Sequence, residues 1–123
     1  MPPAQPQPLP APGPAGVQLV IELRGGEGLD DAARIEQAFR DCVAACGARL
    51  LHLHTHRFSP QGVTGVAVLA ESHITVHTWP EHGYAAFDIF MCGAADPWRA
   101  VPVLRRAFAT EDVAVTELRR GPA

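Results

Sequence analysis

The segment Glu71-Ser72-His73, inside the run from Ala70 to Glu81, has the residue types needed for a self-cleaving peptide bond. A serine hydroxyl can attack the preceding carbonyl and convert the Glu71-Ser72 amide into an ester, if the backbone is strained and a donor stabilises the oxyanion. A base such as His77 could then remove the Ser72 α-proton and expel the Glu71 carboxylate, leaving a dehydroalanine that hydrolyses to a pyruvoyl group. The sequence therefore indicates a chain that makes its own cofactor.

A ketone at residue 72 would supply chemistry that the other side chains lack. All ten basic residues are arginine, so there is no lysine to anchor pyridoxal phosphate. A pyruvoyl ketone can form a Schiff base with a substrate amine and accept the electrons released as CO2 leaves. The resulting carbanion needs a proton, for which the Cys92 thiol is a suitable donor. We therefore predict Ser72, His77 and Cys92 as the catalytic residues.

The spacing of Ser72 and His77 sets a geometric condition. The two residues are five positions apart, so in a straight strand their side chains point to opposite faces. If both act on one reaction, the chain must bend near Ser72.

Composition limits the class of protein. The chain has 123 residues, enough for one domain that a partner subunit would help to bury. Seven of the twelve prolines lie in residues 1–16, which we expect to be an extended tail before a single domain at 17–123. A net charge of -3 argues against nucleic acid, and the three scattered cysteines fit free thiols in a reducing compartment. With no apolar stretch long enough for a membrane helix and no secretory signal, we expect a cytoplasmic protein.

Hydrophobic periodicity predicts the elements that would position these residues. Apolar residues spaced by three and four from Leu29 to Cys46 predict a helix, with Asp30 and Asp31 in its first turn and Gly47 at its end. A second helix opens at Asp96-Pro97, and Pro102 is expected to kink it. Six strands are predicted at 17–23, 51–58, 63–69, 73–78, 85–91 and 113–118. The fold class is therefore α+β, a two-layer sandwich of a mainly antiparallel sheet with both helices on one face.

Taken together, residues 71–93 resemble the prokaryotic S-adenosylmethionine decarboxylase proenzymes, whose signature reads E-S-H-x-[ST]-[IV]-H-T-W-P-E-x-G-Y-A-x-x-D-[IL]-F-x-C-G. Every fixed position is matched. The resemblance implies cleavage into a β chain, 1–71, and an α chain, 72–123, that starts with a pyruvoyl group. It also implies a homodimer of cleaved protomers whose active sites involve both subunits, and a product used in spermidine biosynthesis.

The resemblance also implies roles for individual residues. His77 matches the processing histidine and Cys92 the proton-donating cysteine. Phe58 and Glu81 match residues associated with adenine stacking and ribose hydroxyls. Apart from the resemblance, we expect Trp79, flanked by Thr78 and Pro80, to line the same cleft.

Three positions depart from the family pattern. Thr64 stands where a serine usually assists processing, and its methyl group restricts the hydroxyl rotamer. Gln18 stands where a histidine is common in the first strand, and His82 where a tyrosine is common. Thr64 retains the hydroxyl group and is our predicted processing helper. Whether a diamine activates the enzyme stays open.

Other interpretations of the sequence stay open. Relatives with this signature decarboxylate ornithine or arginine through the same pyruvoyl chemistry, so these amino acids are the alternative substrates. A non-catalytic protein is the alternative of a different class, either a processing-deficient partner subunit or a metal-binding domain. His52, His54 and His56 would share one face of a strand, and Cys42, Cys46 or His77 could complete a zinc site. Core packing is the commoner role of such cysteines, so we predict no metal.

Overall fold

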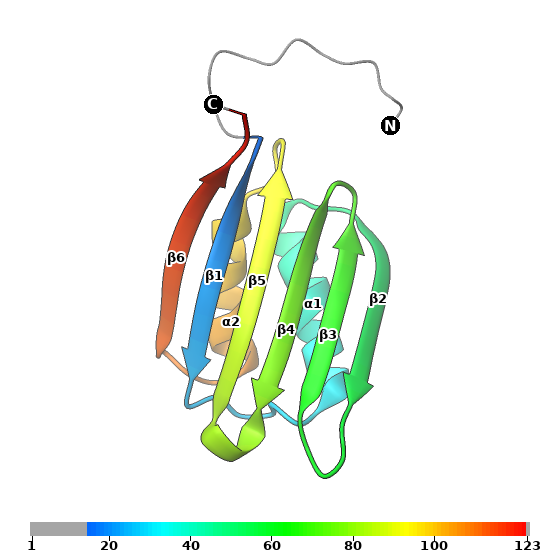
Figure 1. Cartoon of the computed structure of the whole chain (residues 1–123), viewed down its shortest axis with the longest axis vertical. Coiled ribbons are helices and arrows are strands. Elements are labelled where there is room, and N and C mark those ends of the chain that lie inside the picture. Colours follow the sequence, from blue (N-terminus) through cyan, green and yellow to red (C-terminus); the bar gives the residue numbers. More distant parts are fainter. Residues whose placement is uncertain (1–14, 123) are drawn as a thin grey trace.

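The computed structural model describes residues 15–122, which form one antiparallel sheet covered by two helices (Figure 1). The predicted tail at 1–16 lies outside these residues except for its last two, and Gly16 already belongs to the first strand. The strands are β1 (Gly16–Arg24), β2 (Leu50–Arg57), β3 (Val63–Leu69), β4 (Ser72–Trp79), β5 (Tyr84–Cys92) and β6 (Val113–Arg120). The helices are α1 (Ala32–Cys46) and α2 (Ala100–Ala107), with 3₁₀ turns η1 (Pro80–His82) and η2 (Pro97–Arg99).

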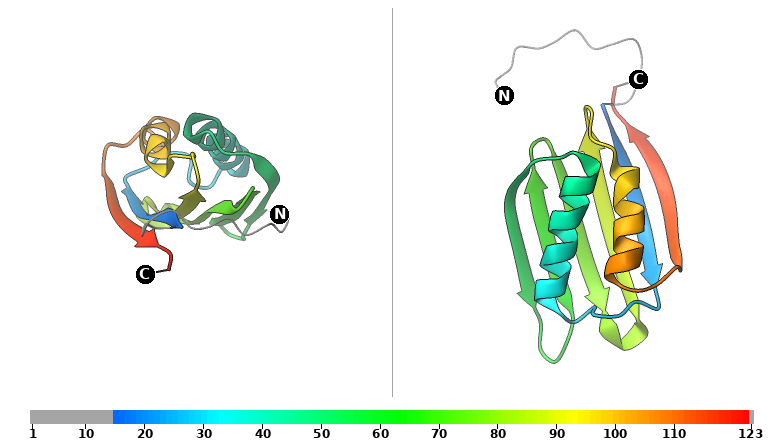
Figure 2. Two further views of the ribbon diagram at one scale, coloured as in Figure 1. Left: turned by 90° about the horizontal axis from the view of Figure 1, so that it is seen from above. Right: turned by 180° about the vertical axis from the view of Figure 1, so that it is seen from behind.

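The sheet order is β2-β3-β4-β5-β1-β6, with every neighbouring pair antiparallel. The N-terminal strand β1 thus lies between β5 and β6, and α1 provides the crossover from β1 to β2 at the far edge of the sheet. Both helices lie on the same face (Figure 2). The predicted two-layer α+β sandwich is confirmed.

Alternation along the strands separates a core face from an open face. Leu19, Ile21, Ile74, Val76 and Phe87 are buried against the helices, where Phe39 of α1 also has no exposed surface. The residues between them project from the other face of the sheet, which neither helix covers (Figure 2). Four of the large exposed hydrophobic side chains belong to the strands or loops of this open face: Phe58, Val68, Trp79 and Leu118.

The helix α1 forms where its apolar spacing predicts it, with one correction at its start. Asp31 is the N-cap and accepts a hydrogen bond from the backbone N–H of Arg34, so Asp30 and Asp31 precede the first turn instead of lying in it. Gly47 ends the helix with a φ of 74°, a conformation that glycine adopts without a steric penalty. Asp30 is thereby free to bind elsewhere in the fold.

The second helix differs from the prediction at Pro102. Asp96 caps the 3₁₀ turn η2 through the N–H of Trp98, and the α-helix begins only at Ala100. Pro102 therefore lies in the first turn of α2, where its missing N–H costs little, and it does not kink a helix interior. Neither helix in residues 15–122 is long and apolar enough to cross a membrane.

Candidate active site

The Glu71-Ser72 bond lies at the tip of the hairpin that joins β3 to β4. Leu69 pairs with Ser72, so Ala70 and Glu71 alone make the turn. Glu71 has a φ of 62°, in the left-handed region that a non-glycine residue enters at an energetic cost. The sequence required a departure from straight strand geometry next to Ser72, and the structure places a strained turn there.

Cys92 approaches this bond from the end of the neighbouring strand β5. Its Sγ lies 3.2 Å from the carbonyl oxygen of Glu71, a distance at which the thiol donates a hydrogen bond to that carbonyl. The same sulfur lies 3.9 Å from the Ser72 hydroxyl oxygen. The structure thus brings together the predicted nucleophile, the carbonyl it must attack and a donor on that carbonyl's oxygen. This arrangement can polarise the carbonyl and stabilise negative charge on its oxygen.

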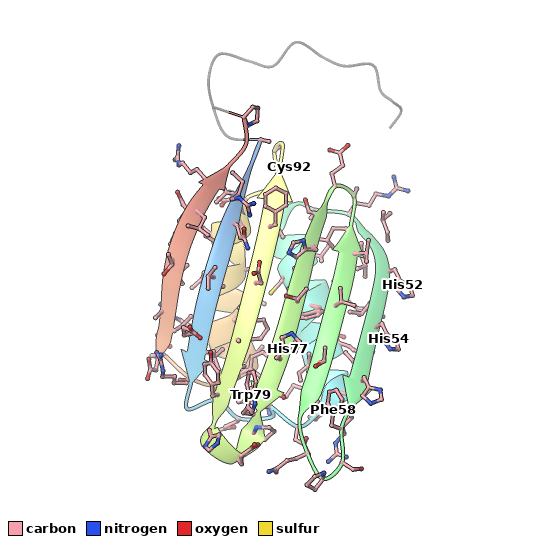
Figure 3. All side chains as sticks on the ribbon, viewed as in Figure 1. His52, His54, Phe58, His77, Trp79 and Cys92 are labelled. Carbon is pink, nitrogen blue, oxygen red and sulfur yellow. The ribbon has the colours of Figure 1, made fainter. Side chains whose placement is uncertain are left out.

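His77 lies elsewhere on the same strand. It is five residues beyond Ser72, which corresponds to about 16 Å along a strand, and its exposed side chain is on the open face. Its Nδ1 is 3.0 Å from the hydroxyl oxygen of Thr64 on β3, the predicted processing helper. Figure 3 shows Cys92 at one end of the sheet and His77 towards the other. Within one chain, the turn at Glu71 does not bring His77 to Ser72.

The predicted substrate-binding residues lie at the His77 end of the sheet (Figure 3). The Trp79 ring stacks on Tyr84 with centroids 5.3 Å apart, and Phe58 packs edge-on against His56 at 4.6 Å. Trp79 and Phe58 keep 40% and 47% of their surfaces exposed, so both rings are available to a planar ligand. Glu81 follows Trp79 in the turn η1 and is exposed, as is His82 beside it.

Asp30 fixes the loop that presents Phe58. Its carboxylate accepts from the N–H of Gly62 at 2.8 Å and pairs with the Arg57 guanidinium. The Gly62 N–H and this guanidinium hold the pKa of Asp30 below its usual value. Phe58 in turn donates its backbone N–H to the Gly62 carbonyl at 2.8 Å, which closes the loop.

Sequence reasoning assigned no role in the site to several polar residues of the open face. Glu22 of β1 accepts a hydrogen bond from the Tyr84 hydroxyl, which raises the pKa of Tyr84. Gln18 of β1 contacts Asp88 of β5 at 2.9 Å. Alternation along β5 could have placed Tyr84 and Asp88 on the face of Cys92. Their partners on β1 could not be inferred, because the pairing of β1 with β5 joins residues about 70 positions apart.

The residues considered for a metal do not gather. His52, His54 and His56 project from the open face of β2, whereas Cys42 and Cys46 are buried on α1 behind the sheet. Burial raises the pKa of both thiols, that of Cys46 to about 11, so neither is a ready ligand. Among residues 15–122, no group of three histidine, cysteine or acidic side chains is placed to bind a metal ion.

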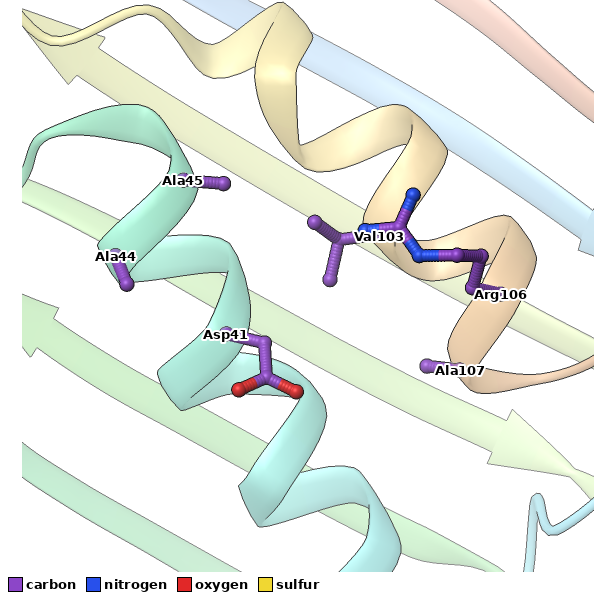
Figure 4. Close-up of a pocket in the computed structure, with 6 residues that line it drawn as sticks. All are labelled: Asp41, Ala44, Ala45, Val103, Arg106 and Ala107. Carbon is purple, nitrogen blue, oxygen red and sulfur yellow. The ribbon is translucent and has the colours of Figure 1, made fainter.

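A groove between the two helices lies on the helical side of the molecule, opposite the open face of the sheet (Figure 4). Its lining residues are Asp41, Ala44, Ala45, Val103, Arg106 and Ala107. It contains none of the residues predicted to act in catalysis or binding. The open face of the sheet is therefore the candidate active surface.

Comparison with known proteins identifies the family of the chain. The family model described as S-adenosylmethionine decarboxylase matches residues 17–121. An S-adenosylmethionine decarboxylase proenzyme of Methanococcus maripaludis strain C7 is 50% identical over 109 residues, covering 86% of this chain and 89% of that protein. The proenzyme of Thermomicrobium roseum is 44% identical over 108 residues, covering 86% and 93%. The crystal structure of the adenosylmethionine decarboxylase from Aquifex aeolicus VF5 superimposes with a TM-score of 0.81 at 29% identity, covering 91% and 95%.

The fold and these matches define the class of the protein as a decarboxylase, a carboxy-lyase with a two-layer α+β architecture. More narrowly, the chain belongs to the S-adenosylmethionine decarboxylase family.

Proposed function

We propose that this protein is a pyruvoyl-dependent S-adenosylmethionine decarboxylase that activates itself by cleavage between Glu71 and Ser72. The contact of the Cys92 thiol with the Glu71 carbonyl, next to the Ser72 hydroxyl, is the main support for this proposal. The product, decarboxylated S-adenosylmethionine, would serve spermidine biosynthesis.

The proposed cleavage uses residues that meet at the hairpin tip. The Ser72 oxygen bonds to the Glu71 carbonyl carbon while the amide C–N bond breaks, which gives an ester and a free amine at Ser72. Loss of the Ser72 α-proton to a base then breaks the bond between Cβ and the ester oxygen. The Glu71 carboxylate leaves as the end of the β chain, 1–71. Water hydrolyses the remaining enamine to a pyruvoyl group on the α chain, 72–123, and releases ammonia.

The residues around Ser72 fit a pyruvoyl group. The Glu71 turn is strained before cleavage. Cys92 lies 3.9 Å from the Ser72 hydroxyl oxygen, which leaves with Glu71 but is bonded to the Cβ that the group would retain. When formed, the group supplies a carbonyl that acts as an electron sink for decarboxylation. Cys92 would hold the proton that the substrate carbon receives after CO2 departs.

A homodimer would complete this site. Ser72, at the start of β4, and His77, on the open face, are about 16 Å apart along the strand. A two-fold axis that lies above the open face, parallel to the sheet and across its strands, would pack two open faces together, about 10 Å apart. It would set the Ser72 end of one protomer against the His77 end of the other. The Ser72 α-proton would then pass to His77 of the partner subunit, oriented by the partner's Thr64.

Mixed dimers test this arrangement. Ser72→Ala and His77→Ala chains are each expected to be inactive alone. Refolded together after denaturation, they would form some dimers with one complete site, and part of the activity would return. If the mixture stays as inactive as its components, although mixed dimers are detected by mass, the two residues do not act across subunits.

The aromatic residues support the choice of substrate. Phe58 and Trp79 expose ring faces that could stack on adenine, and the exposed Glu81 could accept hydrogen bonds from ribose hydroxyls. CO2 release from S-adenosylmethionine, ornithine and arginine should be measured on one sample, with Ser72→Ala as the blank. We expect activity on S-adenosylmethionine above both amino acids. A preference for ornithine or arginine would overturn the substrate assignment.

A further inference from the structure

A row of polar contacts crosses four adjacent strands of the open face beside the cleavage site. Arg120 of β6 donates to the Gln18 side-chain oxygen on β1 at 2.6 Å. The Gln18 amide donates to both carboxylate oxygens of Asp88 on β5, at 2.9 and 3.0 Å. The same carboxylate lies 3.5 Å from Nε2 of His73 on β4. Asp88 thus connects β4 to the two strands on its other side.

His73 is held by two kinds of contact. Besides its pairing with Asp88, its ring stacks on Phe90 with centroids 6.0 Å apart and an interplanar angle of 27°. Phe90 is also its direct cross-strand partner. The side chain is therefore fixed from β5 at both its edge and its face.

His73 is also the residue bonded to Ser72. In the uncut chain, residue 72 is held on both sides, by the Glu71 turn and by His73. If the chain is cleaved as proposed above, on which this inference rests, the bond to Glu71 is lost. The first residue of the α chain is then joined covalently to the sheet only through His73, with Leu69 as its cross-strand neighbour on β3.

We propose that Asp88 is a positioning residue, which holds His73 and thereby keeps the new N-terminal group against Cys92 after cleavage. Gln18 supports it by directing two hydrogen bonds onto the Asp88 carboxylate. This gives a function to the glutamine at the position where the family often has histidine. Asp88 does not touch the atoms that react, so its effect is on geometry.

If Asp88 only positions the terminus, its loss should slow decarboxylation but not self-cleavage. A general loss of structure would slow both steps. Before cleavage the intact hairpin already sets the position of Ser72, so Asp88→Ala should leave the rate of self-cleavage within about twofold of wild type. After cleavage the α-chain terminus is less well held, and a misplacement of about 1 Å can reduce turnover by as much as about 100-fold. We expect kcat to fall at least about tenfold with KM nearly unchanged.

The experiment compares wild type, Asp88→Ala, Asp88→Asn and the matched control Asp112→Ala. Asp112 is an exposed aspartate in the segment before β6, remote from Ser72 in the sheet order. Self-cleavage is followed by intact mass, kcat and KM by CO2 release, and the ordering of residues 73–76 by amide hydrogen exchange. The Asp88→Asn side chain retains an oxygen that accepts hydrogen bonds, so this variant should recover part of the lost kcat. Exchange at 73–76 should rise in cleaved Asp88→Ala but not in Asp112→Ala.

The outcomes are distinct. An Asp88→Ala protein with wild-type kcat, or one whose cleavage slows as much as its turnover, overturns the positioning role while self-cleavage of the wild type stands. Unchanged hydrogen exchange at 73–76 in the cleaved Asp88→Ala variant also overturns it. A wild-type chain that never cleaves refutes the proposed function itself, and the positioning role with it.

Discussion

Replacing Cys92 by alanine removes the donor that contacts the scissile carbonyl. The Cys92 thiol is the group at 3.2 Å from the Glu71 oxygen, and a methyl side chain in its place would leave that oxygen without this donor as negative charge develops. We therefore expect Cys92→Ala to fold and to cleave itself slowly.

The size of the effect follows from the type of donor. Removing one hydrogen-bond donor from an oxyanion site typically slows a reaction by about 10²–10³. A thiol is a weaker donor than an N–H group, so the loss should fall lower, at about 10–100-fold. Cys92→Ser retains a donor on a shorter bond to Cβ, so its cleavage rate should be intermediate. Decarboxylation should stay low in both variants, because a serine hydroxyl gives up its proton far less readily than a thiol.

The assay is a time course of cleavage after cell-free synthesis, read by intact mass, with Ser72→Ala as the uncut reference. Hydrogen exchange of each variant checks that the sheet has formed. Cleavage of Cys92→Ala within about twofold of wild type would refute the claim that the thiol stabilises the oxyanion.

Three further predictions concern other parts of the fold. Thr64→Val removes the hydroxyl group 3.0 Å from His77 and should slow self-cleavage, as followed by intact mass. Thr64→Ser should retain or raise the cleavage rate. Equal cleavage rates for the two variants would show that Thr64 takes no part in processing. Asp30→Asn should weaken the contacts with Arg57 and Gly62 and raise KM with little change in kcat, because the Phe58 loop loosens. In wild type the pKa of Asp30 is lowered, so the contacts of its carboxylate persist at neutral pH and are lost only as pH falls through that lowered pKa. Phe39→Ala should cost about 3–5 kcal/mol in the free energy of unfolding, since this ring has no exposed surface; a denaturant titration showing less than about 1 kcal/mol would contradict its place in the core.

Much of the fold could be predicted because local patterns and burial agree. The spacing from Leu29 to Cys46 predicted α1, and Gly47 predicted its end. All six strands were predicted to within a residue or two, four of them from the alternation of apolar and polar residues. Asp31 was predicted one position too far into the helix, because N-cap and first-turn aspartates look alike in sequence. Pro102 was expected to kink a helix, because the 3₁₀ turn before it was not visible in the sequence.

The sequence allowed the residues of the candidate site to be named, but not their arrangement in space. Parity indicated only that Ser72 and His77 do not meet in a straight strand. It did not reveal the turn at Glu71 or the distance along β4. The contact of Cys92 with Glu71, and that of Gln18 with Asp88, depend on which strands are neighbours. A single sequence does not specify that order, because each strand pattern is compatible with several partners.

The most direct test of self-activation is the intact mass of freshly purified protein under denaturing conditions, with Ser72→Ala alongside. The proposed chemistry predicts two fragments from the wild type, 1–71 and 72–123, the second lighter than its encoded peptide by one molecule of ammonia, and a single full-length chain from the variant. A full-length wild-type chain would contradict self-cleavage, and a fragment 72–123 of its full encoded mass would contradict a pyruvoyl group.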